Sequence, residues 1–499
     1  MNNTTTYIFT VLLIFFTSYQ LKAQDGDEPI IRQYSLDQII ELVQSQSPFA
    51  LRAETRKENR YWNYRTYIAQ YRPQVFLSGE LPNFSRVNQA VQQPDGSFEF
   101  RRLNQNLTSL GLGIRQPIGF TGGSVFVQSE LERFDNFETE VTSYSGNPAV
   151  IGFFQPLFNF NRLKWDREIE PLRYEESLKD YAEELEDLAV TATRLYFDVL
   201  LAQVNLELAE RNQANNDTIY QITQGRYNLG KIGEDELLRI EYNLMLSRQE
   251  VAQAQLDLES STLRLRSFVG IKDDEAFTLL LPGEIPDISI DEETAITEAL
   301  KNNPSGVEFE RRIKEAEREV AQAKGNTGLN ATLSATYGLT NRGNQFPDLY
   351  INPENQQRLS IDFDFPILDW GRRKAQVKQA QANYELEQNT VTQDRINFEQ
   401  RVFTLVRTFK MQRNQVEISL IANDIAARKY EISKQRYLIG KTSITDLIIQ
   451  LQEKDRARRD YIRALDDFWN NFYDLRRATL YDFAEDKSLL TSDVMEGYE

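Results

Sequence analysis

The sequence predicts a mixed α and β membrane protein in which a transmembrane β-barrel continues into a long α-helical coiled-coil barrel. Three observations support this fold class. The chain repeats itself at one fixed offset, it contains very long stretches with almost no proline or glycine, and two segments alternate apolar and polar residues in the manner of barrel strands.

A short motif makes the repeat visible. Residues 226–231 read Arg-Tyr-Asn-Leu-Gly-Lys, and residues 436–441, which lie 210 positions later, read Arg-Tyr-Leu-Ile-Gly-Lys. The same offset relates Leu237 to Leu447 and the segment 156–162 to the segment 366–372. One offset that holds across separated segments indicates two structural repeats per chain, each of roughly 200 residues, as in a duplicated domain.

The composition excludes several classes of site. The chain has no histidine and no cysteine, which rules out disulfides, thiolate or imidazole metal ligands, and Ser-His or Cys-His nucleophiles. Its net charge of -18 argues against a nucleic-acid partner, because phosphate binding needs positive charge. No spacing of carboxylates or nucleophiles indicates catalysis, so we expect no enzyme activity, no cofactor and no metal site.

The N-terminus has the features of an export signal. Residues 7–19 are mostly apolar, and a plausible cleavage site precedes Gln24. The apolar run is short for a spanning helix, so we expect residues 1–23 to be a signal peptide rather than an uncleaved anchor. Since no other apolar run approaches the length of a spanning helix, insertion into a membrane has to use strands.

Long helices dominate the pattern. The stretch 161–227 contains one proline, Pro171, and one glycine, Gly225, and the stretch 372–437 contains neither residue type. At 1.5 Å per residue, some 65 residues form a helix of roughly 100 Å. Apolar and small residues in the first stretch follow the alternating four and three spacing of a coiled coil: Leu188, Ala192, Leu195, Val199, Ala202, Leu206 and Ala209.

Two shorter helices are expected, one in each repeat. They run from Ser35 to about Tyr71 and from Asp291 to about Lys324, with Ser35 and Asp291 as N-caps. Taken alone, the helices of the chain also fit a free-standing fibrous coiled coil.

Two segments have the pattern of membrane-spanning strands. Residues 329–340 and 359–365 alternate apolar with polar or small residues on either side of a polar loop at 341–357. A soluble hairpin shows the same alternation, but the export signal favours the barrel. The first repeat holds 46 additional residues, because Pro48 and Pro156 are 108 positions apart whereas Pro304 and Pro366 are 62 apart. Its glycine-rich segment 119–123, flanked by alternating residues, predicts a hairpin turn.

A helix, a strand pair and a long helical hairpin, all present twice with Arg-Tyr-x-x-Gly-Lys at both hairpin tips, resemble the TolC-like outer-membrane efflux protein family. The resemblance covers about residues 35–483 and includes Gln-Pro-Leu-Phe at 155–158. It implies a homotrimer, in which each subunit contributes four strands to a trimeric transmembrane β-barrel and its helices to a tunnel across the periplasm. Two departures are the 46-residue expansion and the sequence Phe-Pro-Ile at 365–367.

The resemblance also suggests a domain organisation and a function. The predicted segments are a signal peptide (1–23), an N-terminal segment (24–34), repeat 1 (35–270, with an expanded strand region 74–158 and a tip 226–237), a linker (271–290), repeat 2 (291–483, with strands 328–367 and a tip 436–447) and a C-terminal tail (484–499). The implied protein is the outer-membrane channel of a tripartite efflux or type I secretion system. Its partners would be a periplasmic adaptor (membrane fusion) protein, an inner-membrane transporter and outer-membrane lipid. A stand-alone outer-membrane diffusion channel and a coiled-coil envelope spacer are the alternatives.

The hairpin tips are the expected adaptor-docking sites. We expect Gly230 and Gly440 to end the long helices with positive φ, which would leave the neighbouring tyrosines and lysines at an exposed apex. The alternative is that these residues only build the turn. The docking residues are Arg226, Tyr227, Gly230, Lys231, Leu237, Arg436, Tyr437, Gly440, Lys441 and Leu447.

Glu236 and Asp446 are the expected periplasmic gate. Each lies six residues past its tip glycine, so three subunits would place six carboxylates in one ring that favours cations. The resemblance assigns this role to Asp446 and, as glutamate, to Glu236. Thr442 and Ile449 stand where the family has an arginine and a second aspartate, so an arginine-carboxylate lock is in question. The alternative is that both acids only begin the following helix.

Overall fold

The computed structural model describes residues 32–271, 277–283 and 285–491. The predicted signal peptide lies outside these residues, as do most of the predicted N-terminal segment and the end of the predicted tail. As far as they are described, the residues form two compact units, and each unit takes segments from both sequence repeats. One unit comprises Met1–Pro48, Thr191–Ile285 and Ser419–Asp466, and the other comprises Phe49–Val190, Pro286–Ile418 and Asp467–Glu499.

The long helices have the same lengths in both halves of the chain. Helices α4 (Arg162–Asn228) and α8 (Arg372–Leu438) each contain 67 residues, and helices α5 (Glu234–Val269) and α9 (Ile444–Thr479) each contain 36. The start of α8 follows that of α4 by 210 residues, and the start of α9 follows that of α5 by the same number. The two helical hairpins therefore have the spacing of the sequence repeat.

The two shorter helices are each broken, and the prediction of uninterrupted helices was wrong. The first is divided into α2 (Leu36–Gln46) and α3 (Pro48–Ala69), and the second into α6 (Glu292–Asn302) and α7 (Pro304–Thr327). Both breaks precede a proline, whose ring disfavours helical geometry in the preceding residue. Accordingly, the ψ angles are 148° at Ser47 and 143° at Asn303.

The predicted N-caps of these helices are confirmed. The Ser35 hydroxyl accepts a hydrogen bond from the Gln38 backbone N–H at 3.3 Å, and the Gln38 side chain accepts one from the Ser35 N–H at 2.9 Å, which completes a capping box. The Asp291 carboxylate accepts a hydrogen bond from the Thr294 backbone N–H at 2.9 Å. Both helices therefore begin where the sequence places them.

One sheet of six strands holds the predicted barrel segments. Its strands are β2 (Gln74–Gln92), β3 (Phe98–Ile118), β4 (Gly123–Asn136), β5 (Val141–Leu157), β7 (Asn330–Gly343) and β8 (Glu354–Asp364). Neighbours in the order β2-β3-β4-β5-β7-β8 are antiparallel. The resemblance implied four strands per subunit, and the expansion of the first repeat accounts for the larger number, because it supplies a second hairpin. Gly122, at a φ of 75°, forms the predicted turn between β3 and β4.

Smaller elements complete the fold. The 3-10 helix η1 (Phe346–Tyr350) lies between β7 and β8, which both extend into the segment that the sequence assigned to a polar loop. Strand β1 (Arg32–Tyr34) pairs in parallel with β6 (Phe277–Leu279), and β9 (Tyr481–Asp482) pairs with β10 (Lys487–Ser488).

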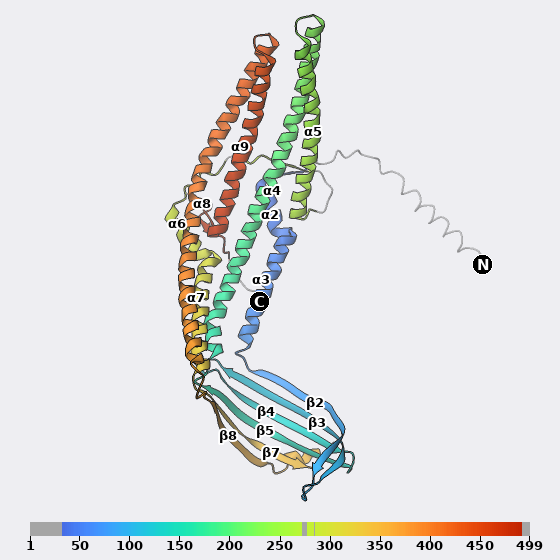
Figure 1. Cartoon of the computed structure of the whole chain (residues 1–499), viewed down its shortest axis with the longest axis vertical. Helices are drawn as coiled ribbons and strands as arrows, with labels where there is room; N and C mark the ends of the chain where they lie inside the picture. Colours follow the sequence, from blue (N-terminus) through green and yellow to red (C-terminus); the bar gives the residue numbers. More distant parts are fainter. Residues whose placement is uncertain (1–31, 272–276, 284, 492–499) are drawn as a thin grey trace, which may run out of the picture. The chain divides into compact units, whose positions relative to one another are not determined.

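The four helices that join the sheet do so at one end of it. Helix α3 leads into β2 and α7 into β7, whereas β5 leads into α4 and β8 into α8 (Figure 1). Because the strands are antiparallel, one end of the sheet holds the starts of β2 and β7 and the ends of β5 and β8. The long helices therefore leave the sheet in one direction.

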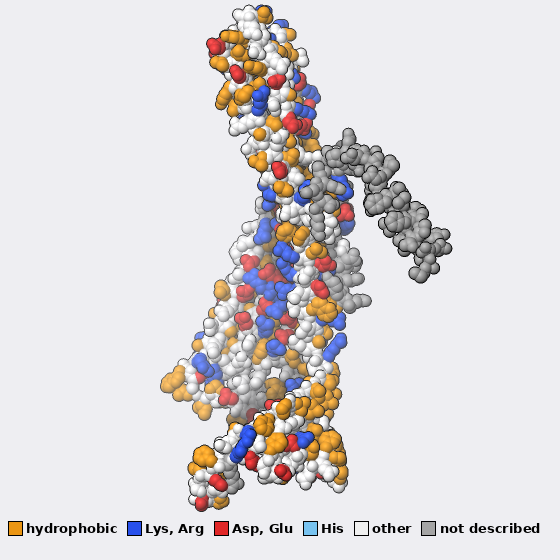
Figure 2. Space-filling model, turned by 90° about the vertical axis from the view of Figure 1, so that its right-hand side faces the viewer, with side chains coloured by type: hydrophobic (Ala, Val, Ile, Leu, Met, Phe, Trp, Pro, Cys, Tyr) orange, Lys and Arg blue, Asp and Glu red, His pale blue; other side chains and the backbone are white. Residues whose placement is uncertain are grey.

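One face of the sheet is apolar and exposed. In register across the strands, Val75 lies beside Ile114, Ile114 beside Val127, and Val127 beside Ile151. Hydrophobic side chains gather over the sheet in the lower part of Figure 2. The exposed apolar residues of this face include Val75, Leu77, Leu110, Leu112, Ile114, Val127, Ile151, Tyr337, Leu359, Ile361 and Phe363.

The opposite face is polar and rich in glycine. It carries Ser334 and Thr336 on β7, and Ser360 and Asp362 on β8, at the positions that alternate with the apolar residues. A Cβ atom added to Gly113 would come within 2.5 Å of the Phe76 ring, which lies across that glycine. Glycine on this strand thus leaves room for the aromatic side chain of its neighbour.

Ion pairs connect the shorter helix α7 to both long helices. Arg311 pairs with Glu176 on α4, and Arg312 pairs with Glu387 on α8 at 2.7 Å and with Asp394 on α8 at 2.9 Å. The arginine side chains are largely buried, so water screens these contacts less than pairs on an open surface.

A buried ion network joins α4, α9 and β9. Arg476 contacts Glu186 at 3.1 Å and Asp482 at 2.7 Å, and the exposed fractions of these two carboxylate side chains are 7% each. The neighbouring pair between Arg477 and Asp187 is more exposed, with Asp187 at 57%. These adjacent pairs allow a direct comparison of buried and exposed ion pairs.

Replacing Glu186 with alanine should destabilise the folded chain by about 3 kcal/mol, because it leaves a buried guanidinium with half of its charge partners. The matched variant Asp187→Ala should cost less than ~1 kcal/mol, since its pair is exposed. Denaturant midpoints of the purified protein, followed by circular dichroism, measure both effects. Equal shifts for the two variants would contradict the structural role of the network.

Candidate functional site

Both helical hairpins turn in the same way. The N–H of Gly230 donates to the carbonyl of Tyr227 at 2.8 Å, and the N–H of Lys231 donates to that of Arg226 at 3.0 Å. In the second hairpin the equivalent bonds measure 2.9 Å and 2.8 Å. The φ angles of Gly230 and Gly440 are 66° and 73°. Together these features form a Schellman motif, so the prediction that both glycines end their helices with positive φ is confirmed.

The helices that follow the two turns begin differently. Ser443 precedes helix α9, and its hydroxyl accepts from the Asp446 backbone N–H at 3.1 Å and donates to the Asp446 carboxylate at 2.7 Å. Gly233 precedes helix α5 as its N-cap and offers no side-chain hydrogen bond. Asp446 therefore has the helix-starting role that the sequence left open as the alternative. Gly233 gives the half-buried Glu236 no equivalent hydroxyl partner.

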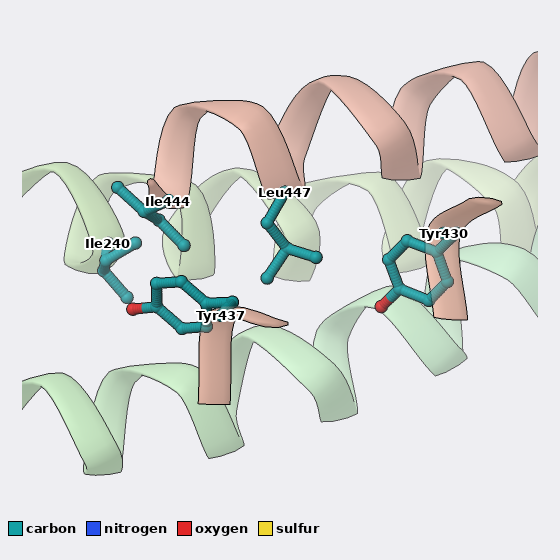
Figure 3. Close-up of a cluster of buried hydrophobic side chains, with 5 residues drawn as sticks. All are labelled: Ile240, Tyr430, Tyr437, Ile444 and Leu447. Carbon is teal, nitrogen blue, oxygen red and sulfur yellow. The ribbon is translucent and has the colours of Figure 1, made fainter. Parts of the chain in front are cut away.

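A hydrophobic cluster holds the two tips together. Tyr430 and Tyr437 of α8 lie beside Ile444 and Leu447 of α9 and Ile240 of α5 (Figure 3). Each of these side chains is at most 5% exposed. Partly buried side chains around the cluster are Ile219, Tyr220, Ile448 and Leu451. Burial raises the pKa of Tyr430 to about 12, so its phenol is neutral at physiological pH.

The expectation of an exposed apex was wrong for Tyr437. This side chain is 3% exposed and Leu447 is 2% exposed, so neither offers its surface to a partner. The Arg226 guanidinium lies 5.4 Å from the centre of the Tyr437 ring and donates to the Leu438 carbonyl at 3.4 Å. Arg226 thus helps to pack one hairpin against the other.

Other tip residues remain accessible. Lys231, Lys441 and Arg436 are exposed, Tyr227 is 38% exposed and Leu237 is half-buried. The two hairpins are therefore equivalent in sequence but not in packing. Tyr437 and Leu447 of the second hairpin are buried against the first hairpin. The equivalent residues of the first hairpin, Tyr227 and Leu237, remain at least partly exposed.

Sequence reasoning missed the cluster and Arg239, which donates from α5 to the Thr445 hydroxyl at 3.1 Å. The available signal was the spacing of seven residues between Tyr430 and Tyr437, which recurs between Tyr220 and Tyr227. A heptad spacing that continues to a hairpin tip indicates a packing seam, but it does not distinguish the buried Tyr437 from the exposed Tyr227.

The described residues include no helix that is long and apolar enough to span a bilayer. Within the same residues, no group of three or more acidic side chains is arranged to hold a metal ion.

Comparison with known proteins identifies the family. A family model described as "Outer membrane efflux protein" matches residues 104–271 and 295–479, which is most of the chain. The chain belongs to the outer membrane efflux protein family. Members of this family are channels and not enzymes. The match begins within β3, so α2, α3 and β2 lie before the matched residues.

Individual relatives are distant. The chain is 24% identical over 261 residues to the probable outer membrane lipoprotein SilC of Salmonella typhimurium, an alignment that covers 50% of the chain and 51% of the relative. The chain thus spans about half the length of this curated relative.

Solved structures show the fold. The CmeC outer membrane channel of Campylobacter jejuni superposes with a TM-score of 0.64 at 17% identity, covering 89% of this chain and 85% of that one. The open state of the MtrE outer membrane channel of Neisseria gonorrhoeae gives a TM-score of 0.60 at 14% identity, covering 89% and 88%. The mixed α and β fold predicted from the sequence is therefore confirmed.

Proposed function

We propose that three copies of this chain form an outer-membrane channel that serves as the passive exit duct of a tripartite efflux or type I secretion system. The observation that carries the proposal is the six-stranded sheet, which is apolar on one face and polar on the other, with its connected helices leaving from one end. Such a sheet suits lipid on one side and a water-filled lumen on the other.

Backbone chemistry supports the oligomer. A strand edge cannot remain unpaired in hydrocarbon, where no water is available for its N–H and C=O groups. Copies arranged around an axis pair these edges with one another, and cyclic symmetry closes the ring. The family resemblance favours three copies.

The tips support the same arrangement. Within one chain, Arg226 of the first hairpin covers Tyr437 of the second. If the repeat continues from copy to copy, the exposed Arg436 covers Tyr227 of the next copy, and Leu237 becomes buried as Leu447 already is. Exposed apolar residues in one hairpin would then be covered by the second hairpin of a neighbour.

The helices suit a role in the periplasm. A helix of 67 residues is roughly 100 Å long, whereas the hydrocarbon core of a bilayer is about 30 Å thick. Most of this length therefore lies in an aqueous compartment. An adaptor docked on the hairpin tips and an inner-membrane transporter would complete the export route.

Two measurements distinguish this function from its alternatives. Reconstitution in a planar bilayer should give ion conductance, which a coiled-coil envelope spacer would lack. Loss of export on deletion of the adaptor or transporter should follow for an exit duct. A stand-alone diffusion channel would conduct and would remain active without either partner.

Reversing the exposed lysine charges at the two tips should abolish export by preventing adaptor docking. The test is the double variant Lys231→Glu with Lys441→Glu, assayed for substrate efflux and for adaptor binding. Arg226 is unsuitable because its replacement also removes the contact with Tyr437. The matched control reverses the exposed Lys374 and Lys378 near the start of α8. Normal efflux by the tip variant would refute docking through these lysines.

Neutralising the acids of the proposed gate should lower cation selectivity and weaken block by divalent cations. The variant is Glu236→Gln with Asp446→Asn, recorded as single channels. Since Asp446 also caps α9, the control is Ser443→Ala, which weakens the cap and leaves the charge unchanged. Selectivity that falls equally in the control would assign the effect to the cap, and unchanged selectivity in the double variant would remove both acids from the gate.

A further inference from the structure

The sheet has two edge strands, β2 and β8, and each has one neighbouring strand and no strand on its outer side among the described residues. We propose that β8 of each copy pairs with β2 of the next copy, so that three copies of the six-stranded sheet close a barrel of 18 strands. This inference rests on the trimer proposed above. It adds the β2–β3 hairpin of the expanded first repeat to the wall of the pore.

The internal repeat specifies which edges meet. Strand β8 leads into α8 as β5 leads into α4, at an offset of 210 residues. Strand β2 follows α3 as β7 follows α7, at an offset of 256 residues, which relates Pro48 to Pro304 and Gln74 to Asn330. Strands β5 and β7 are paired within the chain. The equivalent junction is therefore β8 with β2 of the next copy.

The same correspondence predicts the register. Phe154 pairs with Ser334 in the junction within the chain. The equivalent residues are Asp364 and Ser78 of the next copy, so Phe365 faces Leu77 of that copy. Two apolar residues then meet on the lipid face and two polar residues on the lumen face. A slip by one residue would place each strand's apolar residues opposite the neighbour's polar ones.

The side chains of the β2–β3 hairpin favour a place in the membrane. Val75 and Leu77 of β2 are each 69% exposed and extend the apolar rows of Ile114 and Leu112 on β3. A β-hairpin that is surrounded by water rarely exposes an apolar face of this kind. Strand β3 also pairs with β4 from Gln105 to Ile118, so that edge of β4 is occupied and cannot receive β8 of another copy.

The height of the apolar band agrees with a membrane wall. On β7 the alternation runs from Ala331 to Leu339. Nine residues at about 3.3 Å each, in strands tilted by about 40°, span roughly 23 Å, close to the apolar height of about 25 Å in barrels of this kind. A closed barrel of 16 to 18 strands leaves an aqueous channel, as a duct requires.

Cysteine cross-linking tests the junction cleanly, because the chain has no native cysteine. The variant Ser78→Cys with Asp364→Cys, reconstituted in outer-membrane lipid and treated with a short thiol-specific cross-linker, should give covalently linked trimers on denaturing gels. The matched control Ser78→Cys with Ser360→Cys moves one thiol four residues, or about 13 Å, along the same face of β8 and should not link.

A third variant tests a barrel of 12 strands. If the β2–β3 hairpin is not part of the barrel, β8 must pair with β4 of the next copy. In register with Ser78 across β3, β4 carries Glu130, because Ser78 pairs with Gly111 and Gly111 with Glu130. Linking of Glu130→Cys with Asp364→Cys, in place of Ser78→Cys with Asp364→Cys, would overturn the barrel of 18 strands.

Native mass spectrometry of the same samples separates the two proposals. Three copies with the Glu130 link refute this inference and leave the trimeric duct intact. A single copy with no link in any variant refutes the trimer itself. Three copies linked through Ser78 support both.

Discussion

The need to pair every backbone N–H and C=O group within hydrocarbon is the constraint on which this structure depends. One chain supplies an open sheet with two edges, and an open sheet cannot stand in a bilayer. In the proposed trimer, further copies close the sheet, and this closure brings the connected helices together around one axis. The polar lumen of the proposed duct follows from that closure.

The duplication explains how copies of one chain could close the sheet. Each repeat has a strand that enters the sheet from a short helix and a strand that leaves it into a long one, so the proposed junction between copies repeats the one within the chain. The same holds for the proposed contact between tips, in which Tyr227 receives from another copy the cover that Arg226 gives to Tyr437 within the chain. The first repeat has an additional hairpin, and the alternation of its strands continues the two faces of the sheet.

Local patterns predicted the elements well, and contacts between distant segments were harder to predict. The long helices, the turns at Gly230 and Gly440, and strands β7 and β8 follow from periodicity and from backbone preferences at single positions. The break before Pro48 was readable from the same local chemistry and was overlooked. The burial of Tyr437 could not be read in this way, because the repeat makes it equivalent to the exposed Tyr227. Only the packing of one hairpin on the other distinguishes the two tyrosines.

The claim that one face of the sheet meets lipid and the other meets water is tested most directly by two adjacent residues of β8. Leu359 lies on the apolar face at 73% exposure, and Ser360 lies on the polar face. Lysine on the lipid face near the bilayer centre costs ~2–4 kcal/mol, whereas lysine in the lumen is solvated. The folded fraction of each variant in vesicles, measured across a urea series, should fall for Leu359→Lys and change little for Ser360→Lys. Equal losses, or a larger loss for Ser360→Lys, would contradict the account.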